Sequence, residues 1–314
     1  MRIVVTGAAG FIGSQLVESL LDHGHDIVGI DSFSPYYSAD LKRANIARAQ
    51  EHDSFTLEEA DMNDVKLEHV LEGADAVYHL AGQPGVRASW GQEFDIYLSE
   101  NILATQKLLE AAKARLSGRF VFASSSSIYG QAERFPTQET DTPRPLSPYG
   151  VTKLAAEHLC DLYGKAFGVK TVALRYFTIF GPRQRPDMAF SRFIDAALAG
   201  RPLTVIGDGQ QTRDFTYVAD CVQATISAGE KGTPGAIYNV SGGCRATVLE
   251  VIETLERLLD RRLEREQSGP VPGDPRRTGA DISRARADLS FEPSVSLAEG
   301  LSQQLDHARA TLGR

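Results

Sequence analysis

The sequence predicts an α/β protein in which a doubly wound parallel sheet is followed by a smaller, mixed α/β lobe. Three observations predict it. Apolar strands alternate with helical patterns through the first half, a glycine-rich turn joins the first strand to the first helix, and the second half breaks into short strands and loops. Such alternation is typical of a parallel sheet covered by helices on both faces. Sheets of this kind bind ligands beyond the carboxyl ends of their strands.

The elements of the first half follow in the order that this fold requires. RIVVTG (2–7) predicts the first strand, and FIGSQLVESLLDHG (11–24) predicts an amphipathic helix that ends near Gly24. Further apolar strands are expected at 26–31, 55–61, 76–82, 119–125 and 169–177. Helical patterns separate most of these strands.

The second half is more broken. A loop rich in Arg and Pro (181–190) precedes a predicted helix at 192–201. The segment 202–220 is expected to form a strand, a turn and a second strand, and 247–263 an amphipathic helix. These elements are expected to form a lobe over the carboxyl edge of the sheet.

The length of 314 residues allows one large or two modest domains with a substantial core. We place a soft boundary near residue 180. Residues 1–180 would form the sheet domain and 181–314 the smaller substrate-binding domain, with some interleaving of segments between the two.

Composition limits the class of protein. A hydrophobic content of 42% and a charged content of 24% are ordinary for a soluble globular enzyme. The net charge of −8 argues against a nucleic-acid or anionic-membrane partner, and no apolar run approaches the ~20 residues of a membrane span. Cys160, Cys221 and Cys244 are scattered and lack CxxC spacing. We expect a cytoplasmic protein with reduced thiols and no metal site.

The turn TGAAGFIG carries the first functional signal. Gly7 permits a tight turn, Gly10 lets the backbone approach a pyrophosphate, and Gly13 allows close packing of helix on strand. The pyrophosphate would lie at the helix N-terminus, where free N–H groups favour anions. Asp31, at the end of the second strand, can bind ribose hydroxyls and repels a 2′-phosphate, which favours NAD over NADP. Asp61 ends the third strand and is either an adenine contact or a solvated turn residue.

A second signal is YGVTK, in which Tyr149 and Lys153 stand four residues apart and so share one helix face. A nearby ammonium stabilises a phenolate, so we expect Lys153 to lower the pKa of Tyr149 and to make it a usable general base. Upstream, a strand ends in four hydroxyl residues, Ser124 to Ser127. One of these hydroxyls is expected to bond a reacting sugar hydroxyl.

Together these motifs resemble the extended short-chain dehydrogenase/reductases of the nucleotide-sugar epimerase and dehydratase group, which have a Rossmann sheet. The resemblance spans nearly the whole chain. It rests on TGAAGFIG, Asp31, Asp61, HLAG (79–82), SSSSIYG (124–130), SPYGVTK (147–153), RYFTIFGPRQRP (175–186) and RDFTYVAD (213–220).

The resemblance also implies roles for particular residues. Ser125, Tyr149 and Lys153 would form the catalytic set. The residues implied to line NAD are Gly7, Gly10, Phe11, Ile12, Gly13, Asp31, Ser32, Asp61, Met62, Leu80, Ala81, Gly82, Asn101, Ser124, Tyr149, Lys153 and Tyr176. Those implied to bind the substrate are Arg87, Ser125, Ser126, Thr178, Arg185, Arg213 and Arg276.

The group shares a first step, in which the sugar 4-OH loses a proton and C4 loses a hydride to NAD. Its 4,6-dehydratases carry Asp and Glu directly after the catalytic hydroxyl residue, where this chain has Ser126 and Ser127. UDP-glucuronate decarboxylases usually carry Glu at the position of Ser127. The two serines thus argue against dehydration and decarboxylation, and epimerisation at C4 is the remaining reaction of the group.

The stretch RYFTIFGPRQRPDM indicates the sugar. UDP-galactose 4-epimerases typically have Asn at the position of Thr178, whereas this stretch is similar to UDP-glucuronate 4-epimerases, as are SPYYSADLKR (34–43) and GVRASW (85–90). Arg185 can bind the C6 carboxylate of a uronic acid by charge-assisted hydrogen bonds, and Thr178 can add a donor. By resemblance, Arg213 would bind the diphosphate, and Arg276 and Arg277 lie in a loop that closes over the nucleotide.

The predicted function is therefore an NAD-dependent 4-epimerase that interconverts UDP-glucuronate and UDP-galacturonate through a 4-keto intermediate. A UDP-glucose/UDP-galactose 4-epimerase is the main alternative, followed by a decarboxylase or a 4,6-dehydratase. A non-catalytic NAD-binding scaffold is the alternative outside the enzymes, and an intact Tyr149–Lys153 pair argues against it. Helices around 93–115 and 149–166 resemble those of the group's dimer contact, so a homodimer is expected.

Overall fold

The computed structural model describes residues 1–269 and 271–312, and its centre is a parallel sheet of seven strands. The strand order is β10-β6-β5-β4-β1-β2-β3, and each neighbouring pair is parallel. The strands are β1 (Arg2–Thr6), β2 (Asp26–Asp31), β3 (Phe55–Glu59), β4 (Ala76–His79), β5 (Arg119–Ser125), β6 (Lys170–Tyr176) and β10 (Ile237–Val240). This order reverses direction between β1 and β4, which is the switch point of a doubly wound sheet, and the predicted fold class is confirmed.

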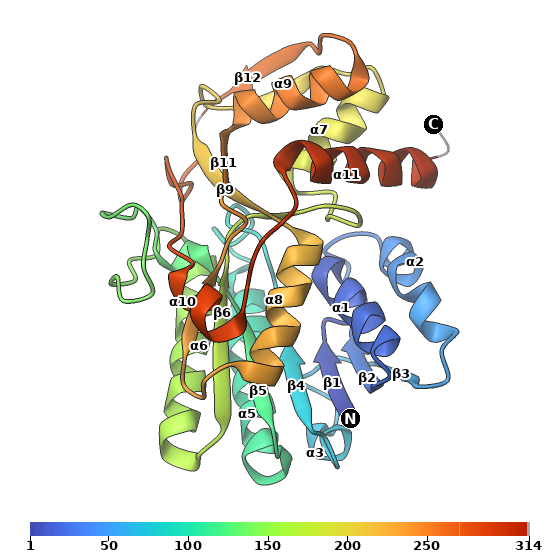
Figure 1. Cartoon of the computed structure of the whole chain (residues 1–314), viewed down its shortest axis with the longest axis vertical. Coiled ribbons are helices and arrows are strands. Elements are labelled where there is room, and N and C mark those ends of the chain that lie inside the picture. Colours follow the sequence, from blue (N-terminus) through green and yellow to red (C-terminus); the bar gives the residue numbers. More distant parts are fainter. Residues whose placement is uncertain (270, 313–314) are drawn as a thin grey trace.

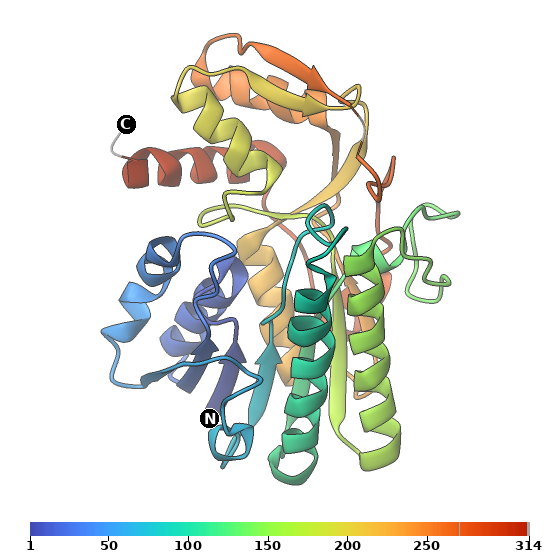
Figure 2. The ribbon, with the colours of Figure 1, turned by 180° about the vertical axis from the view of Figure 1, so that it is seen from behind.

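Helices cover both faces of this sheet (Figures 1 and 2). One face carries α1 (Phe11–Asp22) and α8 (Val218–Lys231), which contact each other. The opposite face carries α5 (Ala104–Arg115) and α6 (Pro148–Phe167), which also contact each other. The buried side chains accordingly form two apolar clusters, one on each side of the sheet. Further elements at this level are α2 (Ala39–Gln50), α3 (Leu67–Val70), α4 (Phe94–Tyr97), the π-helix η1 (Leu98–Leu103) and the 3-10 helix η2 (Ser126–Ile128).

Most of the remaining elements form the smaller lobe at the top of Figure 1, above the carboxyl ends of the large sheet, whereas α10 (Ser283–Leu289) packs against α8 and β10. A three-stranded sheet has the order β11-β9-β7, and a two-stranded sheet pairs β12 with β8. The strands are β7 (Ile179–Phe180), β8 (Leu203–Ile206), β9 (Thr212–Tyr217), β11 (Cys244–Thr247) and β12 (Arg265–Ser268). The helices of the second half, besides α8, are α7 (Ala189–Leu198), α9 (Val248–Leu259), α10 (Ser283–Leu289) and α11 (Leu297–Leu312).

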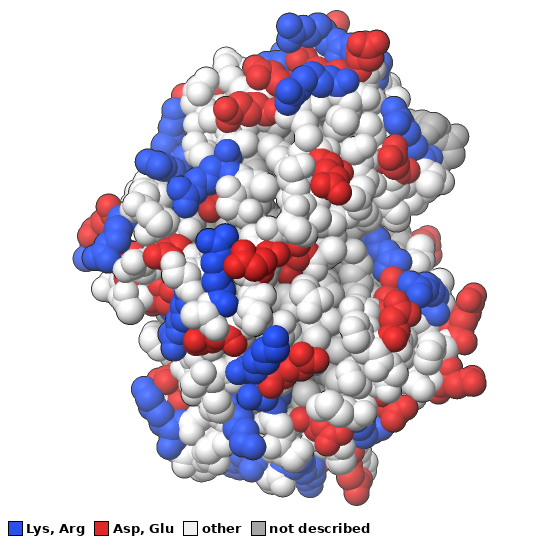
Figure 3. Space-filling model, viewed as in Figure 1, with Lys and Arg blue, Asp and Glu red and all other residues white. Residues whose placement is uncertain are grey.

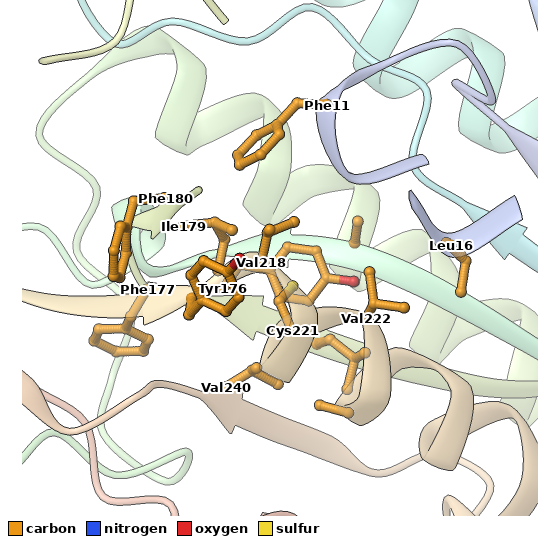
Figure 4. Close-up of a cluster of buried hydrophobic side chains, with 14 of the residues drawn as sticks. Phe11, Leu16, Tyr176, Phe177, Ile179, Phe180, Val218, Cys221, Val222 and Val240 are labelled. Carbon is orange, nitrogen blue, oxygen red and sulfur yellow. The ribbon is translucent and has the colours of Figure 1, made fainter. Parts of the chain in front are cut away.

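The chain crosses between the two parts more than once. It leaves the large sheet after β6, builds β7 to β9 of the lobe, and returns with α8 and β10 before the lobe is completed. Figure 4 shows the buried junction, where Phe11 of α1, Tyr176 of β6, Phe180 of β7 and Cys221 of α8 lie together. A division near residue 180 stays a prediction, and Pro270 and the last two residues of the second segment lie outside the described residues.

Several boundaries differ from the sequence expectation. The segment 202–220 does form two strands, but they do not pair with each other: β8 pairs with β12, and β9 lies between β7 and β11. Each strand finds its partner far along the chain, which a local pattern does not report. The expected third strand, 55–61, ends at Glu59, so Asp61 belongs to the following turn.

The surface has no dominant sign of charge on the face drawn in Figure 3, where basic and acidic side chains are interspersed. Within the described part of the chain, no helix combines the length and the apolar character that crossing a membrane would require.

Candidate functional site

A cavity lies at the carboxyl edge of the large sheet, around the switch point between β1 and β4. It collects most of the predicted cofactor residues, although they come from segments far apart in sequence. The predicted residues in its lining are Gly7, Gly10, Phe11, Ile12, Gly13, Asp31, Ser32, Met62, Leu80, Ala81, Gly82, Asn101, Ser124, Tyr149, Lys153, Tyr176 and Arg185. The predicted residues outside this lining are Asp61, Arg87, Ser125, Ser126, Thr178, Arg213 and Arg276.

The glycine turn has no room for a side chain at Gly7 or at Gly13. A Cβ atom on Gly13 would lie 2.0 Å from the carbonyl oxygen of Gly7, and one on Gly7 would lie 2.9 Å from the backbone nitrogen of Ala81. Gly7 also has a φ of +69°, which L-residues rarely adopt. The turn therefore holds the N-terminus of α1 against the ends of β1 and β4, where an anion can reach its free N–H groups.

Asp31 is buried at the end of β2 and is held on several sides. It accepts hydrogen bonds from the backbone N–H groups of Ala9 (3.1 Å) and Phe33 (2.9 Å), and from the ammonium of Lys42 at 3.2 Å. No site role was predicted for Lys42, which α2 brings back from 11 residues further along the chain.

Asp61 has a local partner. Its Oδ1 accepts from the backbone N–H of Asn63 at 2.7 Å, as in a turn that an aspartate stabilises. The neighbouring Met62 lines the cavity instead. The geometry thus favours the turn role that the sequence analysis had left open for Asp61.

Asn101 lies in η1 and fixes the loop after β4. Its amide oxygen accepts from the N–H of Gln83 at 2.7 Å, and its amide nitrogen donates to the carbonyl of Gln83 and to Thr152, each at 3.0 Å. A Cβ on Gly82 would lie 2.6 Å from Asn101 Oδ1. π-Helical turns are frequent at functional sites, and here the turn presents one amide to a cavity wall.

The catalytic candidates lie at the N-terminus of α6. Ser147 caps this helix by accepting a hydrogen bond from Gly150 N–H at 3.1 Å, and Pro148 is its first residue. Tyr149 therefore lies in the first turn of the helix. Burial raises the pKa of Tyr149, whereas its hydrogen bond with Ser125 and the charge of Arg185 act in the opposite direction.

Lys153 follows Tyr149 by four residues on α6. Its ammonium lies 4.4 Å from the centre of the Phe122 ring, and burial lowers its pKa to about 8. The positive charge of Arg185 favours a lower pKa for the Tyr149 phenol. The expected action of Lys153 on this phenol stays a prediction.

The serine strand end separates its hydroxyls by function. Ser124 donates to Glu157 at 2.7 Å, and Glu157 also binds Arg175 through two hydrogen bonds of 3.1 and 2.6 Å. Ser125 turns the other way, toward Tyr149, and accepts from the N–H of Ser127 at 3.1 Å. The buried pair of Glu157 and Arg175 thereby anchors the strand end that carries Ser125.

Thr178 has a strained backbone. Its φ of +24° is an outlier for a β-branched residue, and such strain clusters at functional sites. The residue lies between β6 and β7, and its carbonyl accepts from Thr216 N–H at 3.1 Å. The surrounding strands therefore impose this conformation on Thr178.

Each of the three predicted anion-binding arginines has an aspartate partner. Arg185 binds Asp187 at 3.0 and 3.1 Å, Arg276 binds Asp208 twice at 2.8 Å, and Arg213 binds Asp274 at 2.5 Å. Arg185 and Arg213 are 20% and 14% exposed, whereas Arg276 is 61% exposed. The first two are therefore better placed than Arg276 to hold a ligand in fixed geometry.

Arg87 belongs to a further basic group. Partial burial lowers its pKa, and the charges of Arg192 and Arg213 act in the same direction, while Asp274 opposes them. Arg192 of α7 was not among the predicted residues. Its only sequence signal is its place after the RPDMAF stretch. Among residues 1–269 and 271–312 we find no group of three His, Cys, Asp or Glu side chains that could hold a metal ion.

Residues 3–241 match the NAD dependent epimerase/dehydratase family. The chain belongs to this family. The match covers the glycine turn, the cavity and the Tyr149 helix together, so the features that predicted the resemblance are those that the family shares.

Alignments with several relatives cover almost the whole chain. It is 45% identical to an uncharacterized UDP-glucose epimerase of Bacillus subtilis, over 97% of each chain. It is 37% identical to the UDP-glucuronate 4-epimerase of Thermodesulfobacterium geofontis, over 98% of this chain and 96% of that one. The crystal structure of UDP-glucuronic acid 4-epimerase from Bacillus cereus, in complex with UDP-glucuronic acid and NAD, superposes with a TM-score of 0.96. The two sequences are 45% identical, and the superposition covers 99% of this chain and 100% of that one.

Proposed function

We propose that the protein is an isomerase, an NAD-dependent 4-epimerase that interconverts UDP-glucuronate and UDP-galacturonate through a transient 4-keto sugar. One observation carries the proposal: the base candidate Tyr149 and the guanidinium of Arg185 line the same cavity as the dinucleotide turn. The cavity thus combines a proton acceptor, a carboxylate-binding group and a cofactor site. Membership of the family and the named relatives support the same reaction.

The residues of the cavity fit NAD. Gly7 and Gly13 have no room for a Cβ, so α1 packs closely against the sheet and its N-terminus lies at the cavity that Gly10 also lines, and Asp31 offers a carboxylate at the end of β2. Bound NAD supplies the acceptor and later the donor of the C4 hydride. The protein's own side chains hold the cofactor, orient the sugar and move the proton.

Proton transfer falls to Tyr149. Its phenol takes the proton of the sugar 4-OH and returns it after the keto sugar has turned over, while the hydroxyl of Ser125 bonds the phenol. Ser126 and Ser127 carry no acid or base, so elimination of water has no acid–base pair there. Epimerisation needs only one base and both faces of the sugar.

The carboxylate explains why the sugar must be held firmly. After oxidation at C4 the substrate is a β-keto acid, which loses carbon dioxide when its carboxylate–C5 bond aligns with the carbonyl π system. We propose that Arg185 and Thr178 hold the carboxylate out of this alignment, so that they serve both recognition and suppression of decarboxylation. The positive φ of Thr178 supports a role beyond packing.

A test is to supply UDP-glucuronate and to separate the products. UDP-galacturonate is the expected product, and a UDP-pentose would identify a decarboxylase instead. Turnover of UDP-glucose alone would favour the second candidate, a UDP-glucose 4-epimerase, which the name of the Bacillus subtilis relative suggests. No turnover of any sugar nucleotide would leave a binding protein without catalysis.

We further propose a cytoplasmic homodimer that binds no metal, nucleic acid or membrane. Large apolar side chains stay exposed on α4, η1 and α6, and these helices lie side by side. They include Ile96, Leu103, Val151, Leu162 and Phe167, which are 41–56% exposed. A second copy of this face would cover them with complementary apolar surface.

A further inference from the structure

Arg185 is held along one edge of its guanidinium. Its Nε donates to Asp187 Oδ1 at 3.0 Å and its Nη2 to Asp187 Oδ2 at 3.1 Å, which fixes the plane of the group. A guanidinium has five N–H donors, and this pairing uses two of them. The opposite edge, formed by Nη1 and the second hydrogen of Nη2, stays available for a carboxylate. The direction of that edge depends on Asp187.

Asp187 is in turn held by a residue from the other half of the chain. Tyr36, in the loop after β2, donates its hydroxyl to Asp187 Oδ2 at 3.2 Å. The Tyr36 ring also lies 5.9 Å from the Arg185 guanidinium, within reach of a cation–π contact. Burial raises the pKa of Tyr36 to about 12, so its hydroxyl keeps its proton at neutral pH and can act as the donor.

Tyr36 itself is seated against a third loop. A Cβ atom on Gly85, in the loop after β4, would lie 2.5 Å from the Tyr36 hydroxyl, and Gly85 has a φ of +106°. The hydroxyl of Tyr97 fixes this loop, because its single O–H lies 3.0 Å from the carbonyl oxygens of both Pro84 and Gly85 and is shared between them. Loops that follow β2, β4 and β7 therefore meet at the Tyr36 hydroxyl.

We propose that Tyr36 and Asp187 form a brace that sets the direction of the Arg185 guanidinium, and thereby the preference for an acidic sugar and the protection of its keto form from decarboxylation. The inference rests on the proposed function. A free arginine side chain has several rotatable bonds and can follow a carboxylate as it rotates. A braced one holds it at a fixed angle to the ring.

Arg185 and Asp187 are close in sequence, and exposed ion pairs between such residues contribute little to the free energy of unfolding. Three observations favour the brace. The pairing is bidentate, Arg185 is only 20% exposed, and Asp187 has a partner that stands 151 residues away in sequence. Neutral sugars have no carboxylate to be positioned, so loss of the brace should affect them less.

The experiment compares Tyr36→Phe with Tyr238→Phe. The first removes the hydrogen bond to Asp187 but keeps the ring and every charge. The second is a matched control that removes a phenol hydroxyl donating to Asp288 at 3.0 Å, on β10 and outside the cavity lining. Calorimetry gives the affinities for UDP-glucuronate and UDP-glucose, and chromatography gives the share of UDP-pentose formed from UDP-glucuronate.

For Tyr36→Phe we expect the affinity ratio of UDP-glucuronate to UDP-glucose to fall by about tenfold, the effect of losing one hydrogen bond to a charged group. The UDP-pentose share should rise above that of the wild type, and Asp187→Asn should raise it too. For Tyr238→Phe both readouts should stay at wild-type values.

Equal ratios and equal pentose shares in Tyr36→Phe and Tyr238→Phe, with an epimerising wild type, would overturn the brace and leave the proposed function standing. If the wild type itself forms no UDP-galacturonate, the proposed function fails first. A rise in pentose with Tyr36→Phe but not with Asp187→Asn would also overturn the brace, because the brace acts through Asp187.

Discussion

Two residues of the cavity have complementary chemistry, because Tyr149 moves a proton and Arg185 supplies a fixed positive charge. That charge is close enough to act on the phenol and to lower its pKa against the effect of burial. A carboxylate bound at Arg185 would weaken this effect, so the acidic sugar has a direct influence on its own base. A neutral sugar would leave the charge of Arg185 unchanged.

Tyr149→Phe should abolish turnover while NAD stays bound. General bases contribute about 10²- to 10⁴-fold to rate, and the phenyl ring keeps the shape of the cavity wall. Product formation from UDP-glucuronate and the NAD content of the purified variant are the two measurements. Residual activity within tenfold of the wild type would show that another group is the base.

Arg185→Ala should weaken binding of UDP-glucuronate by about 10- to 100-fold, the effect of losing hydrogen bonds to a charged group. UDP-glucose should be affected much less, because it has no carboxylate for Arg185 to receive. Titration calorimetry with both sugar nucleotides measures the two losses. Similar losses for both would mean that Arg185 does not bind the carboxylate.

Lys153 predicts a basic limb in the pH profile. Burial lowers its pKa from 10.5 to about 8, so the fraction of ammonium declines as the pH rises through this value. If the ammonium serves the reaction, kcat/KM for UDP-glucuronate falls above about pH 8. A profile that stays flat to about pH 9.5, where an unperturbed lysine is still charged, would exclude this role.

Among the elements, α1 is positioned tightly, because the carbonyl oxygen of Gly7 lies 2.0 Å from the place that a Cβ of Gly13 would occupy. The contact is between two backbone segments, which cannot move aside as a flexible side chain can. The anion site at the N-terminus of α1 therefore depends on close packing against β1.

Gly13→Ala should destabilise the protein by about 1–3 kcal/mol, the usual cost of overpacking a buried site, and should weaken NAD binding. Thermal unfolding and NAD titration measure both effects. Gly269→Ala is the control, because a Cβ there meets nothing within 4 Å among the described residues. A Gly13 variant that unfolds and binds NAD like the control would contradict the packing argument.

At the scale of the whole molecule, local patterns predicted the large sheet well and the lobe less well. Apolar strands such as β1 and β5 are buried on both faces, so their composition alone marks them. The partners of β8 and β9 come from distant segments, and neither strand's own residues indicate them. Lys42 and Tyr36 were missed for the same reason, since each meets its partner only through the fold.

The candidate site likewise contains residues that the sequence predicts and residues that it does not. The glycine turn, Asp31 and Tyr149 are recognisable because their spacing within one segment carries the chemistry. The action of Lys153 on the Tyr149 phenol stays a prediction, because helical spacing gives the shared face but not the direction of a long side chain. Arg185 reaches the phenol from a loop that lies 36 residues further along the chain.

Association of two chains would join the two α6 helices and so affect the whole molecule. Leu162→Glu places a charge on the exposed apolar face of α6, where Leu162 is 56% exposed, and should turn a dimer into monomers of 34.2 kDa. Light scattering after size exclusion measures the mass. Leu41→Glu, on the distant α2, changes a residue that is 38% exposed and should keep the wild-type mass. A Leu162 variant with unchanged mass would place the dimer contact elsewhere.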